Sequence, residues 1–315
     1  MTTAVVFAYH NVGARCLEVL LRHGIDVPLV VTHDDDPAEK IWFDRVADVA
    51  AAHGVAVIAP ADPNTPALLS RIRNLRPEFL FSFYYRRMLS PALLAIPPRG
   101  ALNMHGSLLP SYRGRAPVNW AVLHGESETG ATLHYMVEKP DAGDIVAQGA
   151  VPILPDETAR EVFDKVTSAA AMTLDGVLPR LIAGTAPRIP QDLAQGSYFG
   201  GRKPEDGRID WSRSARDIHN LVRAVAPPFP GAFTHLAGGE LRVLRTRVED
   251  EGTPAGPARV FIVGDRLLAD AGGGGRLEIV AAEWAGRLLD AAAFAKAFGG
   301  PMPLPQSPLL EDAQG

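Results

Sequence analysis

The sequence has little cysteine: Cys16 is the only one in 315 residues. A single cysteine excludes an internal disulfide framework and any zinc or iron–sulfur site built from several thiolates. Long apolar runs are lacking as well, since none approaches the roughly 18 residues that would span a bilayer. The first residues do not form a charged segment followed by an apolar stretch and a cleavage site. We therefore predict a soluble, cytoplasmic protein without a membrane partner.

Excess positive charge is also lacking. The chain has 31 Lys and Arg against 36 Asp and Glu, which gives a formal net charge of −5. Residues 201–315 are nearly balanced, with 14 basic and 15 acidic residues. Proteins that grip nucleic acid neutralise its phosphates with clustered Lys and Arg. The charge balance therefore predicts no nucleic-acid partner.

Hydrophobic residues, by contrast, make up 47% of the chain, which is enough for a sizeable core, and its length favours two domains. Short apolar runs alternate with amphipathic patterns, which predicts a Rossmann-like, doubly wound α/β domain with a parallel sheet. Its first loop, residues 9–14, holds one glycine where a dinucleotide fold needs three, so a nicotinamide dehydrogenase is disfavoured. The expected strands cover residues 4–9, 27–32, 57–59, 79–83, 101–104, 131–136 and 145–151, and the expected helices follow Gly13 up to Gly24 and cover 41–53, 67–75 and 159–182.

The pattern changes after residue 189. Residues 190–204 are poor in periodicity and rich in Pro, Gly and Gln, which predicts a linker between a catalytic domain, 1–189, and a second domain, 205–300. This second domain is expected to start with a helix over 215–224 and to continue as a small, OB-like β-barrel, because short β-like runs alternate there with glycine-rich turns. Residues 301–315 are expected to be a loose tail.

The residues richest in chemistry begin at Asn103, near the end of an expected strand. Asn103 and His105 are two positions apart, so on extended backbone their side chains point the same way. An amide donor beside an imidazole is what oxyanion stabilisation and proton transfer require. The same pair fits a second role, in which both side chains cap the strand end through local backbone hydrogen bonds.

Asp141 lies in a turn that Pro140 and Gly143 favour. This turn could carry the carboxylate back over the sheet end, where it would raise the pKa of His105 and hold the imidazole charged or oriented near neutral pH. Alternatively, Asp141 stabilises only its own turn.

Together these motifs resemble the folate-dependent formyltransferases. The matching residues are the Asn103-x-His105 pair, Ser-Leu-Leu-Pro at 107–110, Arg-Gly-x-x-Pro at 113–117 and the distant Asp141. Within that family the segments at 5–10, 81–86, 105–110 and 222–233 are most similar to enzymes that formylate UDP-4-amino-4-deoxy-L-arabinose, a step in lipid A modification and polymyxin resistance. The resemblance covers about residues 1–300.

The resemblance implies a set of roles for these residues. Asn103 and His105 would act at the formyl carbon, with Asp141 holding His105, and no metal would be needed. The co-substrate 10-formyltetrahydrofolate would contact the following residues: Arg87, Met88, Leu89, Arg115, Val137, Glu138, Lys139, Pro140 and Asp141. Because the decarboxylase half of the bifunctional relatives is absent from the sequence, a separate UDP-glucuronate decarboxylase is the expected functional partner.

Three alternatives stay open at this point. Another nucleotide-linked amino sugar could be the acceptor. Methionyl-tRNA formyltransferases share the Ser-Leu-Leu-Pro signature and the two-domain plan, although the charge balance disfavours them. A non-catalytic folate- or nucleotide-binding domain is the third, and it would have no need for Asn103, His105 and Asp141 together.

Overall fold

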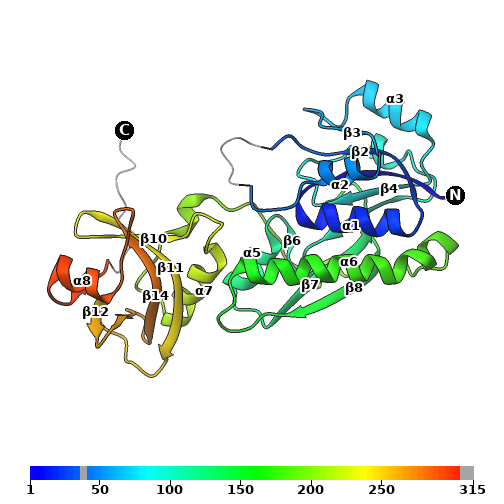
Figure 1. Cartoon of the computed structure of the whole chain (residues 1–315). Helices are drawn as coiled ribbons and strands as arrows, with labels where there is room; N and C mark the ends of the chain where they lie inside the picture. Colours follow the sequence, from blue (N-terminus) through cyan, green and yellow to red (C-terminus); the bar gives the residue numbers. More distant parts are fainter. Residues whose placement is uncertain (36–40, 306–315) are drawn as a thin grey trace, which may run out of the picture. The chain divides into compact units, whose positions relative to one another are not determined.

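The computed structural model describes residues 1–35 and 41–305. They divide into two compact units, each visible in Figure 1. The first unit comprises Met1–Pro117, Glu128–Pro152 and Phe163–Gly200, and the second comprises Val118–Ser127, Ile153–Val162 and the described residues from Gly201 onward. No helix within the described residues is long and apolar enough to cross a membrane.

A seven-stranded sheet with the order β3-β2-β1-β4-β5-β7-β8 forms the first unit. Its strands are β1 Thr3–Ala8, β2 Asp26–Val31, β3 Val57–Ile58, β4 Phe79–Phe83, β5 Ala101–His105, β7 Glu128–Tyr135 and β8 Ile145–Pro152. The first five strands are parallel, whereas β7 pairs antiparallel with β5 and with β8. The predicted parallel sheet therefore holds for these five strands, whereas residues 131–136 and 145–151, for which only extended backbone was predicted, form antiparallel strands.

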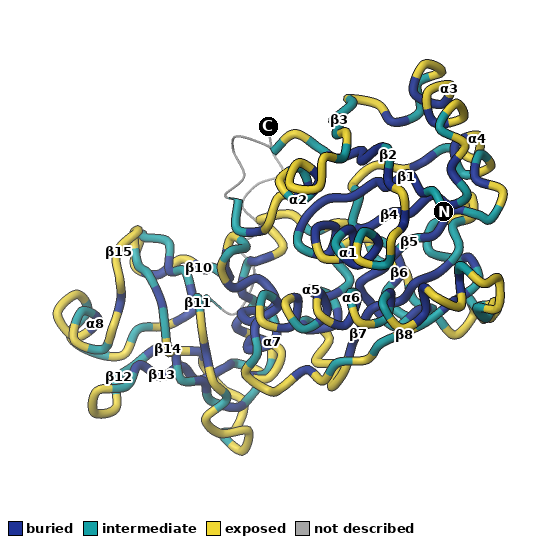
Figure 2. The backbone as a smooth tube through the Cα atoms, turned by 45° about the vertical axis from the view of Figure 1, so that its right-hand side comes forward, coloured by how far each residue is buried: buried dark blue, intermediate teal, exposed yellow. Residues whose placement is uncertain are grey.

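Helices cover both faces of this sheet, as the doubly wound prediction requires. They are α1 His10–Arg22, α2 Val46–Ala52, α3 Pro66–Leu75, α4 Pro91–Leu94 and α6 Ala159–Ala183. On one face α3 and α4 pack against the side chains of Val5, Phe7 and Leu80. On the other face α1 and α6 lie side by side, joined by ion pairs from Arg22 and His23 to Asp175 (Figure 1). The strands between them are buried, while the outer turns of the helices are exposed (Figure 2).

Two helix starts differ from the sequence prediction. The helix expected from residue 41 begins at Val46, and residues 41–45 before it are not helical. The loop expected at residues 9–14 is instead the first turn of α1. Gly13 serves close packing there, since a Cβ on it would lie 2.9 Å from Val46 Cγ2 and 3.2 Å from Ala8 Cβ.

An antiparallel, curled sheet dominates the second unit, in the order β10-β11-β14-β13-β12-β16, with β15 beside β14. Its strands are β10 Ala232–Leu236, β11 Gly239–Asp250, β12 Arg259–Val263, β13 Arg266–Asp270, β14 Arg276–Trp284, β15 Arg287–Leu288 and β16 Met302–Pro303, and its helices are α5 Pro117–Leu123, α7 Ala215–Val225 and α8 Ala291–Phe298. Fully buried Trp211 and Phe294 belong to its core. The predicted fold class, a Rossmann-like α/β domain followed by a small, OB-like β-barrel domain, is confirmed, with the barrel present as a curled antiparallel sheet.

Four short elements lie outside these two sheets. They are β6 Arg113–Gly114, which pairs with β9 Tyr198–Phe199, and the 3₁₀ turns η1 Leu193–Gln195 and η2 Pro204–Gly207. Near the C-terminus, β16 pairs with β12 inside the expected tail. The rest of that tail, residues 306–315, lies outside the described residues.

Candidate active site

Asn103 and His105 lie on β5, in the interior of the first unit's sheet between β4 and β7. His105 is buried, and its Nε2–H donates to the carbonyl oxygen of Tyr112 at 2.8 Å. A carbonyl can only accept, so this bond fixes one side of the imidazole ring. Nδ1 on the other side faces Asp141, at 3.5 Å from Oδ1.

Asp141 reaches this place from the turn between β7 and β8. Its backbone has φ +52°, a left-handed conformation that a non-glycine residue keeps only where its surroundings fix it. Oδ1 lies near both His105 and His134, and Oδ2 accepts the backbone N–H of Gly114 at 2.9 Å. The structure thus brings the three predicted catalytic residues, Asn103, His105 and Asp141, into one cluster.

His134 is the member of this cluster that sequence reasoning missed. It stands on β7 directly opposite Asn103, and this register between strands cannot be read from the sequence. His134 Nδ1–H donates to the carbonyl oxygen of Tyr135 at 2.8 Å, which leaves Nε2 as the acceptor for the Asn103 amide N–H at 3.1 Å. This bond fixes the orientation of the Asn103 amide.

Burial and charge act against each other on His105. Burial lowers the pKa of His105 below its ordinary value, although the Asp141 carboxylate and the Tyr112 carbonyl raise it; His134 lowers it slightly further. Asp141 thus raises the pKa of His105, but desolvation of the imidazolium outweighs the carboxylate. Of the two expected effects, a charged or an oriented imidazole, the contact at Nδ1 fits the second. For Asp141, burial alone would raise the pKa, but His105 and the Gly114 amide hold the pKa of Asp141 far below its ordinary value.

Gly106 packs against Tyr84 directly beside the cluster. A methyl group on Gly106 would overlap the Tyr84 hydroxyl and lie 3.0 Å from its Cζ, so this position requires glycine. The buried Tyr84 hydroxyl has no hydrogen-bond partner within the part of the chain that the structure describes. Tyr84 also has a positive φ of +57°, and so do Tyr112 (+57°) and Ala116 (+51°), so strained backbone gathers in the loops around His105.

The Ser-Leu-Leu-Pro motif at 107–110 forms a turn held by β7 and β8. Thr132 donates its hydroxyl to the Ser107 carbonyl at 2.6 Å and accepts the Leu109 N–H at 3.1 Å. Gln148 donates to the Leu109 carbonyl and to the Thr132 hydroxyl, both at 2.9 Å. The motif therefore contributes shape rather than a reactive group.

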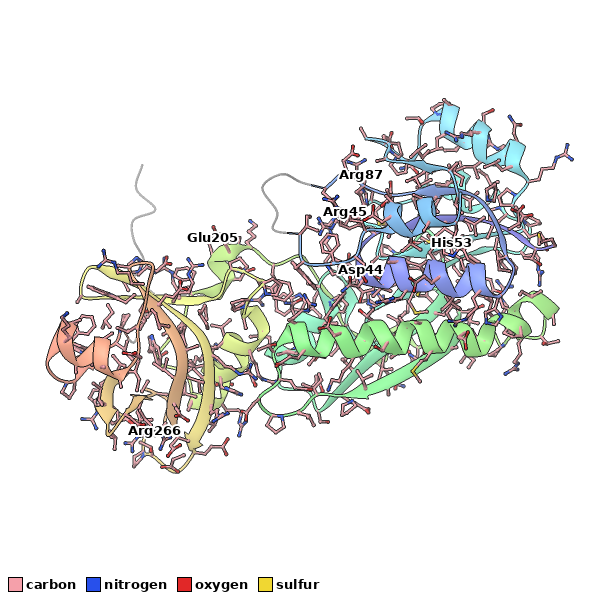
Figure 3. All side chains as sticks on the ribbon, in the orientation of Figure 1. Asp44, Arg45, His53, Arg87, Glu205 and Arg266 are labelled. Atoms are coloured by element: carbon pink, nitrogen blue, oxygen red, sulfur yellow. The ribbon has the colours of Figure 1, made fainter. Side chains whose placement is uncertain are left out.

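The first predicted folate segment, Arg87, Met88 and Leu89, follows β4. Arg87, which Figure 3 labels, donates to the carbonyl oxygens of Pro60 and Ala61. Met88 is exposed on this loop (61%), whereas Leu89 is buried against the apolar cluster of α3 and α4. The loop therefore presents one flexible apolar side chain to solvent on a fixed backbone.

A pocket of about 400 Å³ lies beside this loop, lined by His33, Asp34, residues 59–61, Arg86 and Arg87. His33 Nε2 accepts the backbone N–H of Arg86 at 3.0 Å, which requires an uncharged imidazole. Burial, helped by Arg87 and Arg86, lowers the pKa of His33 to about 4. This part of the loop therefore keeps its hydrogen bond over the physiological pH range.

The second predicted folate segment follows β7. Val137, Glu138 and Lys139 are exposed, and Pro140 is half-buried. Met136, just before them, packs against the same apolar cluster as Leu89, so the two segments border one cluster. Arg115, the remaining predicted folate contact, is exposed, and its backbone N–H donates to the Phe199 carbonyl at 2.9 Å.

Arg113 differs from its arginine neighbours because its side chain is buried, at 7% exposure. Its Nε has no hydrogen-bond partner, and no carboxylate pairs with its guanidinium, within residues 1–35 and 41–305. A buried guanidinium donor without a partner is costly, so this position suits an anionic group brought by a ligand. Over the same described residues, no group of three or more His, Cys, Asp or Glu side chains could hold a metal ion.

Comparison with solved structures finds the same fold in two N-formyltransferases and in HypX. An N-formyltransferase from Helicobacter canadensis, solved with folinic acid and dTDP-3-aminofucose, superimposes with a TM-score of 0.70 at 20% identity, covering 89% of this chain and 99% of that one. WlaRD, a sugar 3N-formyl transferase solved with dTDP and 5-N-formyl-THF, gives 0.70 at 16% identity, covering 88% and 97%. HypX from Aquifex aeolicus gives 0.61 at 19% identity, covering 94% of this chain and 47% of that one.

Comparison with protein families is more specific than these structural likenesses. Residues 202–299 match the C-terminal domain of formyl transferases. Residues 5–178, more than half of the chain, match the formyl transferase family and include every predicted catalytic residue. The chain therefore belongs to the formyl transferase family, as its motifs predicted.

Proposed function

We propose that this protein transfers a formyl group from 10-formyltetrahydrofolate to the amino group of a nucleotide-linked amino sugar. The proposal rests mainly on the cluster of Asn103, His105 and Asp141, in which a fixed amide donor lies beside a buried imidazole and its carboxylate partner. Family membership supports the reaction. The solved relatives that bind formyl folates and dTDP or a dTDP-sugar support the two substrates.

Asn103 supplies the hydrogen-bond donor. An amine that attacks a formyl carbon turns the formyl oxygen into an oxyanion. One N–H of the Asn103 amide is held by His134, so the amide is already oriented and its second N–H can donate to that oxygen. Removing one such donor typically lowers kcat by about 10² to 10³.

His105 moves the proton. Because burial lowers its pKa, the imidazole is uncharged at pH 7 and can accept the proton that the attacking amine loses. The Asp141 carboxylate beside Nδ1 then stabilises the imidazolium until the proton passes to the departing nitrogen. Asp141 stays ionised throughout, since its own pKa is held far below the ordinary range.

The loops after β4 and β7 fit the formyl donor, which supplies the activated one-carbon unit. Both carry an exposed apolar side chain, Met88 (61%) and Val137 (46%), where a flat aromatic ring system can pack. Carbonyl and N–H groups of the ordered backbone at 87–89 and 137–141 can bind ring heteroatoms. Arg87 and Arg115 supply positive charge that can bind carboxylates of the formyl donor.

Arg113 fits the acceptor. Its buried, unpaired guanidinium needs an anion, and the diphosphate of a nucleotide sugar is one. We place UDP-4-amino-4-deoxy-L-arabinose first among acceptors because the motifs at 5–10, 81–86 and 222–233 are most similar to enzymes using it. On this proposal the chain serves lipid A modification and polymyxin resistance, downstream of a UDP-glucuronate decarboxylase.

A substrate panel tests the proposal. Tetrahydrofolate release from 10-formyltetrahydrofolate is measured with UDP- and dTDP-linked amino sugars and with charged initiator methionyl-tRNA, using Asn103→Ala and His105→Ala as inactive controls. We expect the highest kcat/KM with the UDP-linked 4-amino sugar and none with tRNA. Preference for a dTDP-sugar would overturn the choice of nucleotide, and activity confined to tRNA would overturn the sugar class.

A further inference from the structure

The segment 191–199 runs from Gln191 through η1 to β9 and lies within the first unit. Its sequence has no periodic pattern and none of the catalytic motifs. We propose that the 191–199 segment positions the catalytic imidazole, with Gln191 and Ser197 as positioning residues for Asp141 and for the Tyr112 carbonyl. The inference rests on the proposed function, because it concerns the same reaction.

Gln191 holds the turn that carries Asp141. Its Nε2 donates to the carbonyl oxygens of Asp141 at 3.1 Å and Gly143 at 2.6 Å. Two carbonyls can be bridged only by the amide NH₂ group, so the orientation of this side chain is determined. Just before it, Ile189 exchanges two backbone hydrogen bonds with Ile145, at 2.8 and 2.9 Å, which anchors the start of the segment.

The Asp141 turn depends on this support. Residues 137–139, which lead into the turn, are exposed and add little packing of their own. Asp141 has φ +52°, a conformation that persists only where neighbouring groups fix it. Without Gln191 the turn loses the donor to its Asp141 and Gly143 carbonyls, and the Gly114 N–H bond to Oδ2 is left to hold the Asp141 carboxylate near His105.

Ser197 holds the opposite side of the imidazole. Its Oγ accepts the N–H of Tyr112 at 2.8 Å, and its carbonyl accepts the N–H of Arg113 at 3.0 Å. The Tyr112 carbonyl between these two N–H groups is the acceptor for His105 Nε2–H. Phe199 stacks on the Tyr112 ring with centroids 5.3 Å apart, which adds a side-chain contact to the same residue.

One short segment therefore fixes the hydrogen-bond acceptor on the Nε2 side of His105 and the carboxylate on its Nδ1 side. The charged and polar groups that face this imidazole are Asp141, His134 and the Tyr112 carbonyl. Of these, the two that raise the pKa of His105 are the two that the 191–199 segment holds. Loosening the segment should lower the pKa of His105 and slow the proton transfer, because both groups stabilise the imidazolium.

The test compares Gln191→Leu, which removes the donor at similar size, with Gln195→Leu as a matched control. Gln195 lies on the same segment and is exposed, and among the described residues its side chain bonds only to Asp192. We expect Gln191→Leu to lower kcat at least tenfold, with KM for 10-formyltetrahydrofolate within about threefold of the wild type. Gln195→Leu should match the wild type in both constants.

Ser197 provides a second pair of variants. Ser197→Ala should lower kcat like Gln191→Leu, and Ser197→Thr should restore it, because threonine keeps the Oγ acceptor. The independent readout is the pKa of His105 from NMR titration of labelled imidazoles, assigned with His105→Gln. It should fall by at least half a unit in Gln191→Leu and Ser197→Ala and stay unchanged in the two control variants.

An unchanged or raised pKa of His105 in folded Gln191→Leu protein, or equal losses in Gln195→Leu, would overturn the positioning role. The titration needs no substrate. A wild-type chain that formylates no amino sugar would thus overturn the proposed function, while the titration would still decide whether the 191–199 segment sets the imidazole.

Discussion

Removing the charge of Asp141 should lower the pKa of His105 by an amount that the structure allows us to work out. Asp141→Asn keeps an oxygen that can accept the Gly114 N–H, so the turn has the same bonds. The lost charge lies 3.5 Å from Nδ1. Coulomb's law at this distance gives about 1.2 kcal/mol with the dielectric constant of water and about 4.7 kcal/mol with an effective value of 20.

Because 1.36 kcal/mol corresponds to one pKa unit, these limits convert to about 0.9 and 3.5 units. Both side chains are largely buried, so we expect a fall of about one to three units. The sign follows from the chemistry, since a carboxylate stabilises the imidazolium and its loss favours the neutral ring. The acid limb of the pH profile of kcat should move to lower pH. The plateau value of kcat should also fall, because the imidazolium that forms during proton transfer loses its carboxylate partner.

NMR titration of the labelled His105 imidazole and the pH dependence of kcat measure these two effects. Asp144→Asn is the control, because it removes a carboxylate from the same turn that does not face His105. Asp141→Asn with His105→Ala should be hardly worse than His105→Ala alone, since residues acting as a unit are not additive. An unchanged His105 titration in folded Asp141→Asn protein, or additive losses, would refute the reasoning.

Three further predictions concern the surroundings of the cluster. Gly106→Ala should destabilise the protein by about 1 to 3 kcal/mol through overpacking against the Tyr84 hydroxyl. In a double-mutant cycle measured by urea unfolding, adding Tyr84→Phe should relieve part of this loss, and strictly additive changes in the free energy of unfolding would contradict the contact between the two residues. His134→Leu should lower kcat about tenfold because the Asn103 amide loses its acceptor; steady-state kinetics with no change would remove His134 from the site. The folded pKa of His33, about 4, is below its ordinary value of 6.5, so its contribution to stability is present above pH 6.5 and is lost as the pH falls toward 4. In urea unfolding, the free energy of unfolding of His33→Gln should fall less between pH 6.5 and 4 than that of the wild type. The same pH dependence in both proteins would contradict the lowered pKa of His33.

The order of strands and helices could be predicted well because it is a local property. The strand at 79–83 and the helix from Ala159 were predicted almost to the residue, since uninterrupted apolar runs and 3.6-residue spacing are visible in the sequence. The direction of β7 could not be predicted. Its connection from β5 includes a helix, α5, as a parallel crossover would, and its buried pattern suits either direction.

The contacts of the site likewise divide into those between residues close in sequence, which could be predicted, and those between distant residues, which could not. Asn103 and His105 could be paired from their spacing on one strand, which is again local. His134 enters the cluster through the register between β5 and β7, and Gln191 bonds to Asp141 from 50 positions along the chain. Neither contact leaves a periodic signal. The net direction of the pKa shift of His105 could not be predicted for a related reason, since burial depends on the whole fold and the sequence shows only the nearby carboxylate.

The interleaving of the two units has a consequence for how the protein is made. Val118–Ser127 and Ile153–Val162 belong to the second unit although they precede most of it in the chain. Asn119 donates to the Ala224 carbonyl at 2.8 Å, and the Pro155 carbonyl accepts from His219 at 2.9 Å. Both stretches leave the ribosome before those partners exist, so the second unit can close only late in synthesis. For the same reason, a chimera of two relatives with one junction near residue 200 would combine residues of both parents in the core of the second unit. A chimera that exchanges the whole second unit must also exchange 118–127 and 153–162.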